Sequence, residues 1–154
     1  MPSESPELIA PQNIYADDRG RIVSLPPFPA TGVLIIESEP GAVRGNHFHA
    51  QESHLMHVVS GRMIYLEESA SGTVAATEVK AGETVISERG LAHCTVFPER
   101  TVICVLNDVD RTGHRYEDEV VRVEPLDQRI DLGRFVGPDF ALVRASPAAV
   151  QKKG

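Results

Sequence analysis

Histidine is the residue type whose number and spacing in this sequence most clearly suggest chemistry. Of the six histidines, four fall within eleven residues, at positions 47, 49, 54 and 57. Side chains two residues apart on a strand face the same way, so we expect His47 and His49 to share a face, and His54 can return beside them across a hairpin. His93 could supply a fourth imidazole from the start of another strand. The sequence thus predicts that His47, His49, His54 and His93 converge.

Such a cluster of imidazoles is suited to binding a metal ion. Imidazole nitrogen suits zinc, iron, copper and nickel, whereas magnesium and calcium prefer oxygen ligands. The residues do not choose among these metals, and we expect one divalent transition metal such as zinc, iron or nickel. Four neutral imidazoles leave the metal charge uncompensated, which favours Lewis-acid activation of water or a carbonyl. Glu52 could substitute as a ligand, but its spacing is wrong for that role.

Short β-branched runs separated by turn residues must position these side chains. No convincing periodicity of a helix of useful length appears. Turns are marked by dipeptides that end in glycine, including Pro40-Gly41, Ser60-Gly61 and Ala81-Gly82. This rhythm predicts an all-β sandwich or barrel. The expected strands are residues 33–36, 54–59, 63–66, 74–79, 84–86, 95–97, 101–106 and 120–123.

Length and composition predict a single domain. The 154 residues suffice for one core, and we expect a domain over 13–145 between a flexible arm, 1–12, and a flexible tail, 146–154. A net charge of -7 argues against nucleic-acid and anionic-membrane partners. No secretory signal pattern, no membrane-length apolar run and only two cysteines are found. These features predict a cytoplasmic protein.

Two spaced motifs resemble those of the cupin superfamily. Five, one, four and six residues separate Gly41, His47, His49, His54 and Gly61 in turn, and this resembles the first cupin motif with His54 where Glu is usual. The second motif is matched by Gly82, Glu88, Gly90, His93 and Phe97, with Glu88 at the usual Pro position and Phe97 at the usual Asn position. The resemblance covers roughly residues 33–106 and implies a single jelly-roll β-barrel, with the four histidines at the metal-ligand positions.

A further resemblance concerns the segment from Val43 to His49, which reads Val-Arg-Gly-Asn-His-Phe-His. It is similar to the Arg-Gly-x-His motif of cupins that act on nucleotide-activated 4-keto sugars: dTDP-4-dehydrorhamnose 3,5-epimerases, dTDP-sugar 3,4-ketoisomerases and the cupin domain of capsular-sugar reductases. The segment Asp17-Asp18-Arg19-Gly20 also resembles the entry to those proteins. The resemblance implies an isomerase or epimerase that acts alpha to a carbonyl and binds the sugar nucleotide near Arg44.

The same resemblance creates a conflict at His47. In the epimerases the matching histidine is a general base, but a metal-bound imidazole nitrogen cannot also accept a proton. We favour the metal version, in which the metal polarises the keto oxygen and another residue moves the proton. Candidates for that residue are Tyr65, His57 and Tyr116. His57 has the opposite strand parity to His54, so we expect it to face outward.

Other functions stay open. A four-histidine cupin could instead be a metal-dependent polyketide-type cyclase or dioxygenase of secondary metabolism, or a non-catalytic module that binds a small ligand. The absence of Trp and the few other aromatic residues give no obvious platform for stacking a nucleobase. Cys94 follows His93 directly and is expected to pack in the core, away from the metal. We expect a small-molecule substrate and a homodimer paired through edge strands and N-terminal arms.

Overall fold

The computed structural model describes residues 6–110 and 118–145, and these form an all-β structure. Its elements comprise β1 (Leu8–Ile9), β2 (Gln12–Asp17), β3 (Gly20–Ser24), β4 (Gly32–Ser38), β5 (Val43–His49), β6 (His54–Ser60), β7 (Arg62–Glu68), β8 (Val74–Lys80), β9 (Thr84–Ser87), β10 (His93–Val96), β11 (Thr101–Asn107), β12 (Val120–Arg122) and the short 3-10 helix η2 (Leu126–Gln128). No α-helix occurs in these two ranges, and hence none that is long and apolar enough to cross a membrane.

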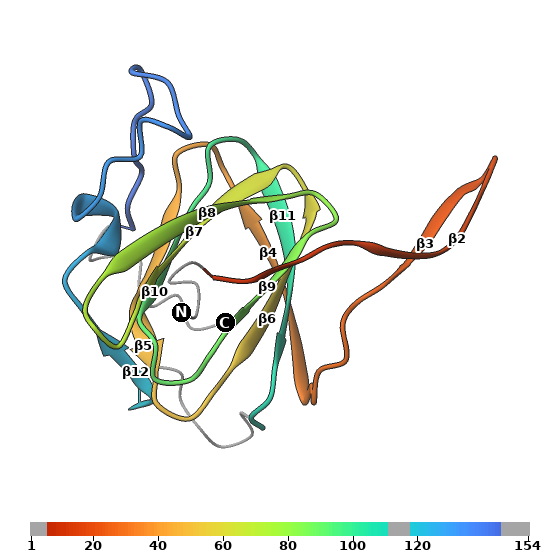
Figure 1. Ribbon diagram of the computed structural model, residues 1–154, viewed down its shortest axis with the longest axis horizontal. Helices are drawn as coiled ribbons and strands as arrows, with labels where there is room; N and C mark the ends of the chain where they lie inside the picture. The colour runs from red at the N-terminus through yellow and green to blue at the C-terminus, as the bar shows by residue number, and fades with distance from the viewer. Residues whose placement is uncertain (1–5, 111–117, 146–154) are drawn as a thin grey trace.

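Ten of the twelve strands in the described residues form two facing sheets, seen almost edge-on in Figure 1, and β2 and β3 form a separate hairpin. One sheet has the order β1-β9-β6-β11-β4 and the other has the order β12-β5-β10-β7-β8. Every pairing between named strands is antiparallel. Apart from β7 and β8, neighbours in these two sheets are not consecutive in the chain, as in a jelly roll. The predicted all-β fold is therefore confirmed.

The main core lies between the two sheets. Strand alternation sends every second side chain inward, and the inward set is apolar. This core comprises Met56, Val58, Met63, Tyr65, Val79, Val85, Phe97, Ile103 and Val105. A second apolar cluster covers the outer face of the β5-β10-β7 region, where the C-terminal segment packs through Leu126, Ile130, Leu132, Phe135, Val136 and Phe140. Cys94 is fully buried in this second cluster, so its predicted core role is confirmed.

The N-terminal region differs from the expectation. The segment Asp17-Asp18-Arg19-Gly20 forms the turn that joins β2 to β3 in a hairpin, and this hairpin projects from the barrel (Figure 1). Leu8 and Ile9 lie in the segment expected to be a flexible arm, yet they pair with Val85 and Thr84 of β9. The reason is that β9 is otherwise an edge strand with backbone groups available for pairing. Two residues are too few to show the alternation of a strand, so this non-local contact could not be predicted from the sequence.

Candidate metal and substrate site

A cavity of about 400 Å³ opens between the two sheets at the end where β5 and β6 meet. Much of its wall is apolar, formed by Leu34, Ile36, Val43, Met56, Ile103 and Val105. The polar part of the wall contains all four predicted metal ligands, together with Arg44, Thr95 and Arg122. The predicted convergence of the histidines in one cavity is therefore observed.

Three of these histidines form a compact group. His47 and His49 lie two apart on β5, and His93 lies on the adjacent strand β10, directly opposite His47. The ring centroid of His47 lies 4.8 Å from that of His49 and 5.0 Å from that of His93. All three side chains are buried, and each offers a nitrogen within 4.8 Å of the others. This is the spacing at which three imidazoles could share one ion.

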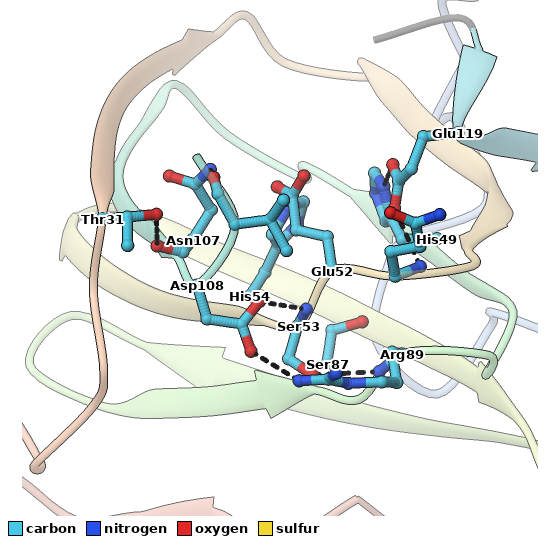
Figure 2. Close-up of polar contacts among 12 residues, drawn as sticks. Thr31, His49, Glu52, Ser53, His54, Ser87, Arg89, Asn107, Asp108 and Glu119 are labelled. Carbon is cyan, nitrogen blue, oxygen red and sulfur yellow. Dashed lines mark hydrogen bonds and ion pairs between the residues drawn. The ribbon is translucent and has the colours of Figure 1, made fainter. Parts of the chain in front are cut away.

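Hydrogen bonds to Nδ1 orient the rings of His49 and His93. Nδ1 of His49 donates to Oε2 of Glu119 at 2.8 Å, and Figure 2 shows these two side chains side by side. Nδ1 of His93 lies 2.9 Å from the hydroxyl oxygen of Ser87. Hydrogen bonds of this kind leave Nε2 as the ligand atom and hold the ring in place. The residues present therefore fit a metal ion.

His54 belongs to the same cavity but has a different partner. Its Nε2 bonds to Oε1 of Glu52, and both side chains are buried (Figure 2). His54 and Glu52 form a second group with metal-ligand spacing together with His49, which also belongs to the first group. The structure thus brings a carboxylate into the site beside the fourth histidine. Either Glu52 or His54 could complete the set, and the four-histidine ligand set stays a prediction.

Burial keeps His47 and His93 neutral. Loss of hydration lowers the pKa of His47 from 6.5 to about 3, with smaller contributions from His49 and Arg122. The same cause lowers the pKa of His93 well below its ordinary value. A metal binds the neutral imidazole, so both residues are in the form that a metal requires.

Tyr65 lies beside the histidine cluster but, like His57, is not among the described residues that line the cavity. Its ring stacks near His93, with centroids 6.2 Å apart, and its hydroxyl donates to Oε2 of Glu67 at 2.7 Å. The side chain is fully buried, and this burial raises its pKa well above the ordinary value. Burial also raises the pKa of Glu67. Tyr65 is therefore protonated at neutral pH.

The other predicted site residues lie in different places. Arg44 lines the cavity, where its Nε donates to Ser38 Oγ at 2.9 Å and a terminal nitrogen donates to the Glu37 carbonyl at 3.1 Å. His57 is not among the described residues that line the cavity; its Nδ1 lies 2.9 Å from Thr84 Oγ1, as its outward parity predicted. Tyr116 lies outside the described residues.

Sequence reasoning missed three residues of the site: Ser87, Glu119 and Arg122. Arg122 lines the cavity because β12 pairs with β5, which sets it opposite His47. The strand at 120–123 was predicted, but its partner was not. Ser87 hydrogen-bonds to His93, six residues away in sequence, and Glu119 hydrogen-bonds to His49, seventy residues away. No local pattern could have revealed those contacts.

Comparison with known proteins supports the fold. No family model matches the chain. A germin-like protein of rice (Oryza sativa subsp. japonica) is 34% identical over 81 residues, which are 51% of this chain and 35% of that protein. The chain thus matches about a third of the length of this curated relative.

Solved structures match over more of the chain. The rmlC epimerase of Mycobacterium tuberculosis superposes with a TM-score of 0.76 at 16% identity, covering 97% of this chain and 84% of the other. The dTDP-4-dehydrorhamnose 3,5-epimerase of Sulfolobus tokodaii superposes with a TM-score of 0.70 at 17% identity, covering 94% of this chain and 86% of the other. A 3,4-ketoisomerase of Thermoanaerobacterium thermosaccharolyticum, in complex with TDP, superposes with a TM-score of 0.64 at 18% identity, covering 83% of this chain and 98% of the other. The chain therefore has the jelly-roll fold of the cupins, as its two sequence motifs predicted.

Proposed function

We propose that this chain is a metal-binding enzyme that isomerises or epimerises a nucleotide-activated keto sugar alpha to its carbonyl. The observation that carries the proposal is the convergence of His47, His49 and His93 in one cavity that also holds Arg44 and Arg122. Structural neighbours that are epimerases and ketoisomerases support it. A cytoplasmic location remains part of this prediction.

The three clustered histidines would hold the metal, with His54 or Glu52 as a further ligand. When bound, the metal would supply Lewis acidity that polarises a carbonyl oxygen. The chain contributes the arrangement around it: Glu119 and Ser87 hold two of the rings so that their outer nitrogens face the cavity.

Arg44 and Arg122 would bind the anionic part of the substrate. Both line the cavity, and a guanidinium matches the geometry of phosphate oxygens. The contacts of Arg44 with Ser38 and the Glu37 carbonyl hold its side chain in a defined direction, which lowers the cost of ordering it on binding. The diphosphate would lie near these arginines and the keto sugar near the histidines.

Tyr65 is our candidate for the proton carrier. Its ring lies next to His93, whereas His57 lies on the outer face of its sheet. A raised pKa keeps the Tyr65 hydroxyl protonated, so it can donate its proton to the enolate that forms when the α-proton passes to solvent. The half-buried Glu67 carboxylate can then relay a proton from solvent back to Tyr65. Substitution of Tyr65 by Phe should therefore slow proton transfer while leaving metal content unchanged.

A second function is favoured by one observation. The apolar wall of the cavity would suit a substrate of polyketide type, on which a metal-dependent cyclase or dioxygenase acts. Oxygen consumption by the iron-loaded protein with such a substrate would distinguish this function from sugar isomerisation.

The test of the main proposal is solvent exchange in D2O, followed by proton NMR on dTDP-4-keto-6-deoxyglucose. We expect deuterium to enter at a carbon alpha to the carbonyl with the wild-type protein and not with the His47→Ala, His93→Ala double variant. His57→Ala is the matched control, because it removes a histidine outside the cavity. A folded, metal-loaded wild-type protein that neither binds this nucleotide sugar nor exchanges its protons would refute the proposal.

We also propose that the chain forms a homodimer. The β2–β3 hairpin projects from the barrel and exposes Ile14 and Ile22 at 66% and 58%, while β4 exposes Ile35 at 64% on the outer face of its sheet. Packing the hairpin of one copy on that face of a second copy would bury both apolar surfaces. Light scattering should give twice the mass of the chain for the wild type and the monomer mass for Ile35→Asp; a wild-type monomer contradicts this.

A further inference from the structure

Strand β5 contains an irregularity between its arginine and its histidines. On β10 the step from His93 to Cys94 is one residue, but the opposing step on β5, from His47 to Gly45, is two. The extra residue is Asn46, so the strand carries a β-bulge there. Asn46 has φ +57°, in the left-handed region, which non-glycine residues seldom occupy.

The bulge changes which side chains share a face. On a regular strand, residues three apart point to opposite faces. Here Arg44 pairs with Thr95 and His47 pairs with His93, and those two partners are two apart on β10. Arg44 and His47 consequently both line the cavity. Without the extra residue, one of them would point into the apolar cluster on the other face.

A buried polar network holds Asn46 in this conformation. Its Oδ1 accepts from the backbone N–H of Leu126 at 2.8 Å, and its Nδ2 donates to Oδ1 of Asp127 at 3.0 Å. Its carbonyl accepts from the backbone N–H of Val123 at 3.0 Å. The Asp127 side chain is fully buried and forms an ion pair with Arg144. Three hydrogen bonds to a single residue can offset the cost of its left-handed backbone.

Gly45, next to the bulge, lies at a position where a side chain would not fit. Its φ is +89°, and a Cβ atom there would lie 2.9 Å from the carbonyl oxygen of His93 and 3.2 Å from the Cα of Cys94. β5 and β10 thus approach closely at the bulge, next to two of the proposed ligands. Any change in the bulge should be transmitted directly to His47 and His93.

We propose that Asn46 and Asp127 are positioning residues of the site, which hold the bulge that turns Arg44 and His47 into one cavity. This inference rests on the proposed function, because it concerns the ligands of the proposed metal. Neither residue lines the cavity, so each acts through β5. Arg144 extends the network to the C-terminal segment, where Ala145 forms part of the cavity wall.

The test is zinc affinity, measured on metal-free protein by competition with a chromophoric chelator, together with the visible spectrum of the cobalt-loaded protein. Valine strongly disfavours a positive φ, whereas glycine accepts it. We therefore expect Asn46→Val and Asp127→Ala to weaken zinc binding about tenfold or more, the range typical of changes outside the ligand set. Asn46→Gly accepts the positive φ but lacks the side chain that binds Leu126 and Asp127, so its affinity should lie between that of Asn46→Val and that of the wild type. The cobalt spectrum should change in Asn46→Val.

The matched control is Arg129→Ala, which breaks a neighbouring ion pair with Glu68 on the surface and should leave affinity and spectrum unchanged. If Asn46→Val does not fold, Asp127→Ala gives the same readout. Wild-type affinity and an unchanged spectrum in the folded variants would overturn this inference and leave the proposed function intact. A wild-type protein that binds no zinc or cobalt would overturn both.

Discussion

Acid should destabilise the metal-free protein through His47. The unfolded chain binds a proton at this imidazole near pH 6.5, whereas burial lowers the pKa of the folded state to about 3. As the pH falls from 7, the unfolded state takes up the proton and the folded state does not, so unfolding is favoured. The stability is present above pH 6.5 and is lost progressively down to about pH 3. Between pH 7 and pH 5 this one group should cost about 2 kcal/mol.

The assay is urea or thermal unfolding of chelator-treated protein at pH 7 and pH 5, for the wild type and His47→Gln. Glutamine stays neutral, so the variant should lack this contribution. Lowering the pH from 7 to 5 should therefore reduce the Tm of the wild type more than that of His47→Gln. For a domain of this size, about 2 kcal/mol corresponds to an extra reduction of about 4 to 8 °C. Equal losses of stability in the two proteins would refute the reasoning, because His47 would then titrate alike in both states.

Three further substitutions test other parts of the structure. Ser87→Ala removes the partner of His93 Nδ1 and should weaken zinc binding about tenfold or more; unchanged affinity in a chelator competition would contradict the orienting role. Met63→Ala opens a void between the sheets, where the side chain is fully buried, and should lower the free energy of unfolding by about 2–5 kcal/mol, as urea titration would show; a loss below about 1 kcal/mol would contradict the packing. Arg44→Ala should weaken dTDP binding about tenfold or more, since it removes a charged hydrogen-bonding group; calorimetry that finds no change would exclude Arg44 from phosphate binding.

The strand pattern could be predicted because it depends on local alternation. Expected strands such as 101–106 and 74–79 correspond to β11 and β8 within one residue at each end. The shared face of His47 and His49 followed from the same rule, and both line the cavity. The outward position of His57 also followed from parity.

The remaining features depend on contacts between distant segments. Arg44 and His47 should lie on opposite faces of a regular strand, and only the bulge at Asn46 brings them together. That bulge depends on Asp127, eighty-one residues away, which no local pattern connects to it. The spacing of Glu52 in the sequence does not favour it as a ligand, but a bend at residues 50–51 before β6 brings its carboxylate to His54.

The most direct test of the central claim is the metal content of the protein, purified without chelator and measured by elemental mass spectrometry. We predict near-stoichiometric zinc, iron or nickel in the wild type and in His57→Ala, and its loss in the His47→Ala, His93→Ala double variant. A folded wild-type protein without metal would contradict the claim. It would leave His47 available as a base and favour a metal-free epimerase or ketoisomerase.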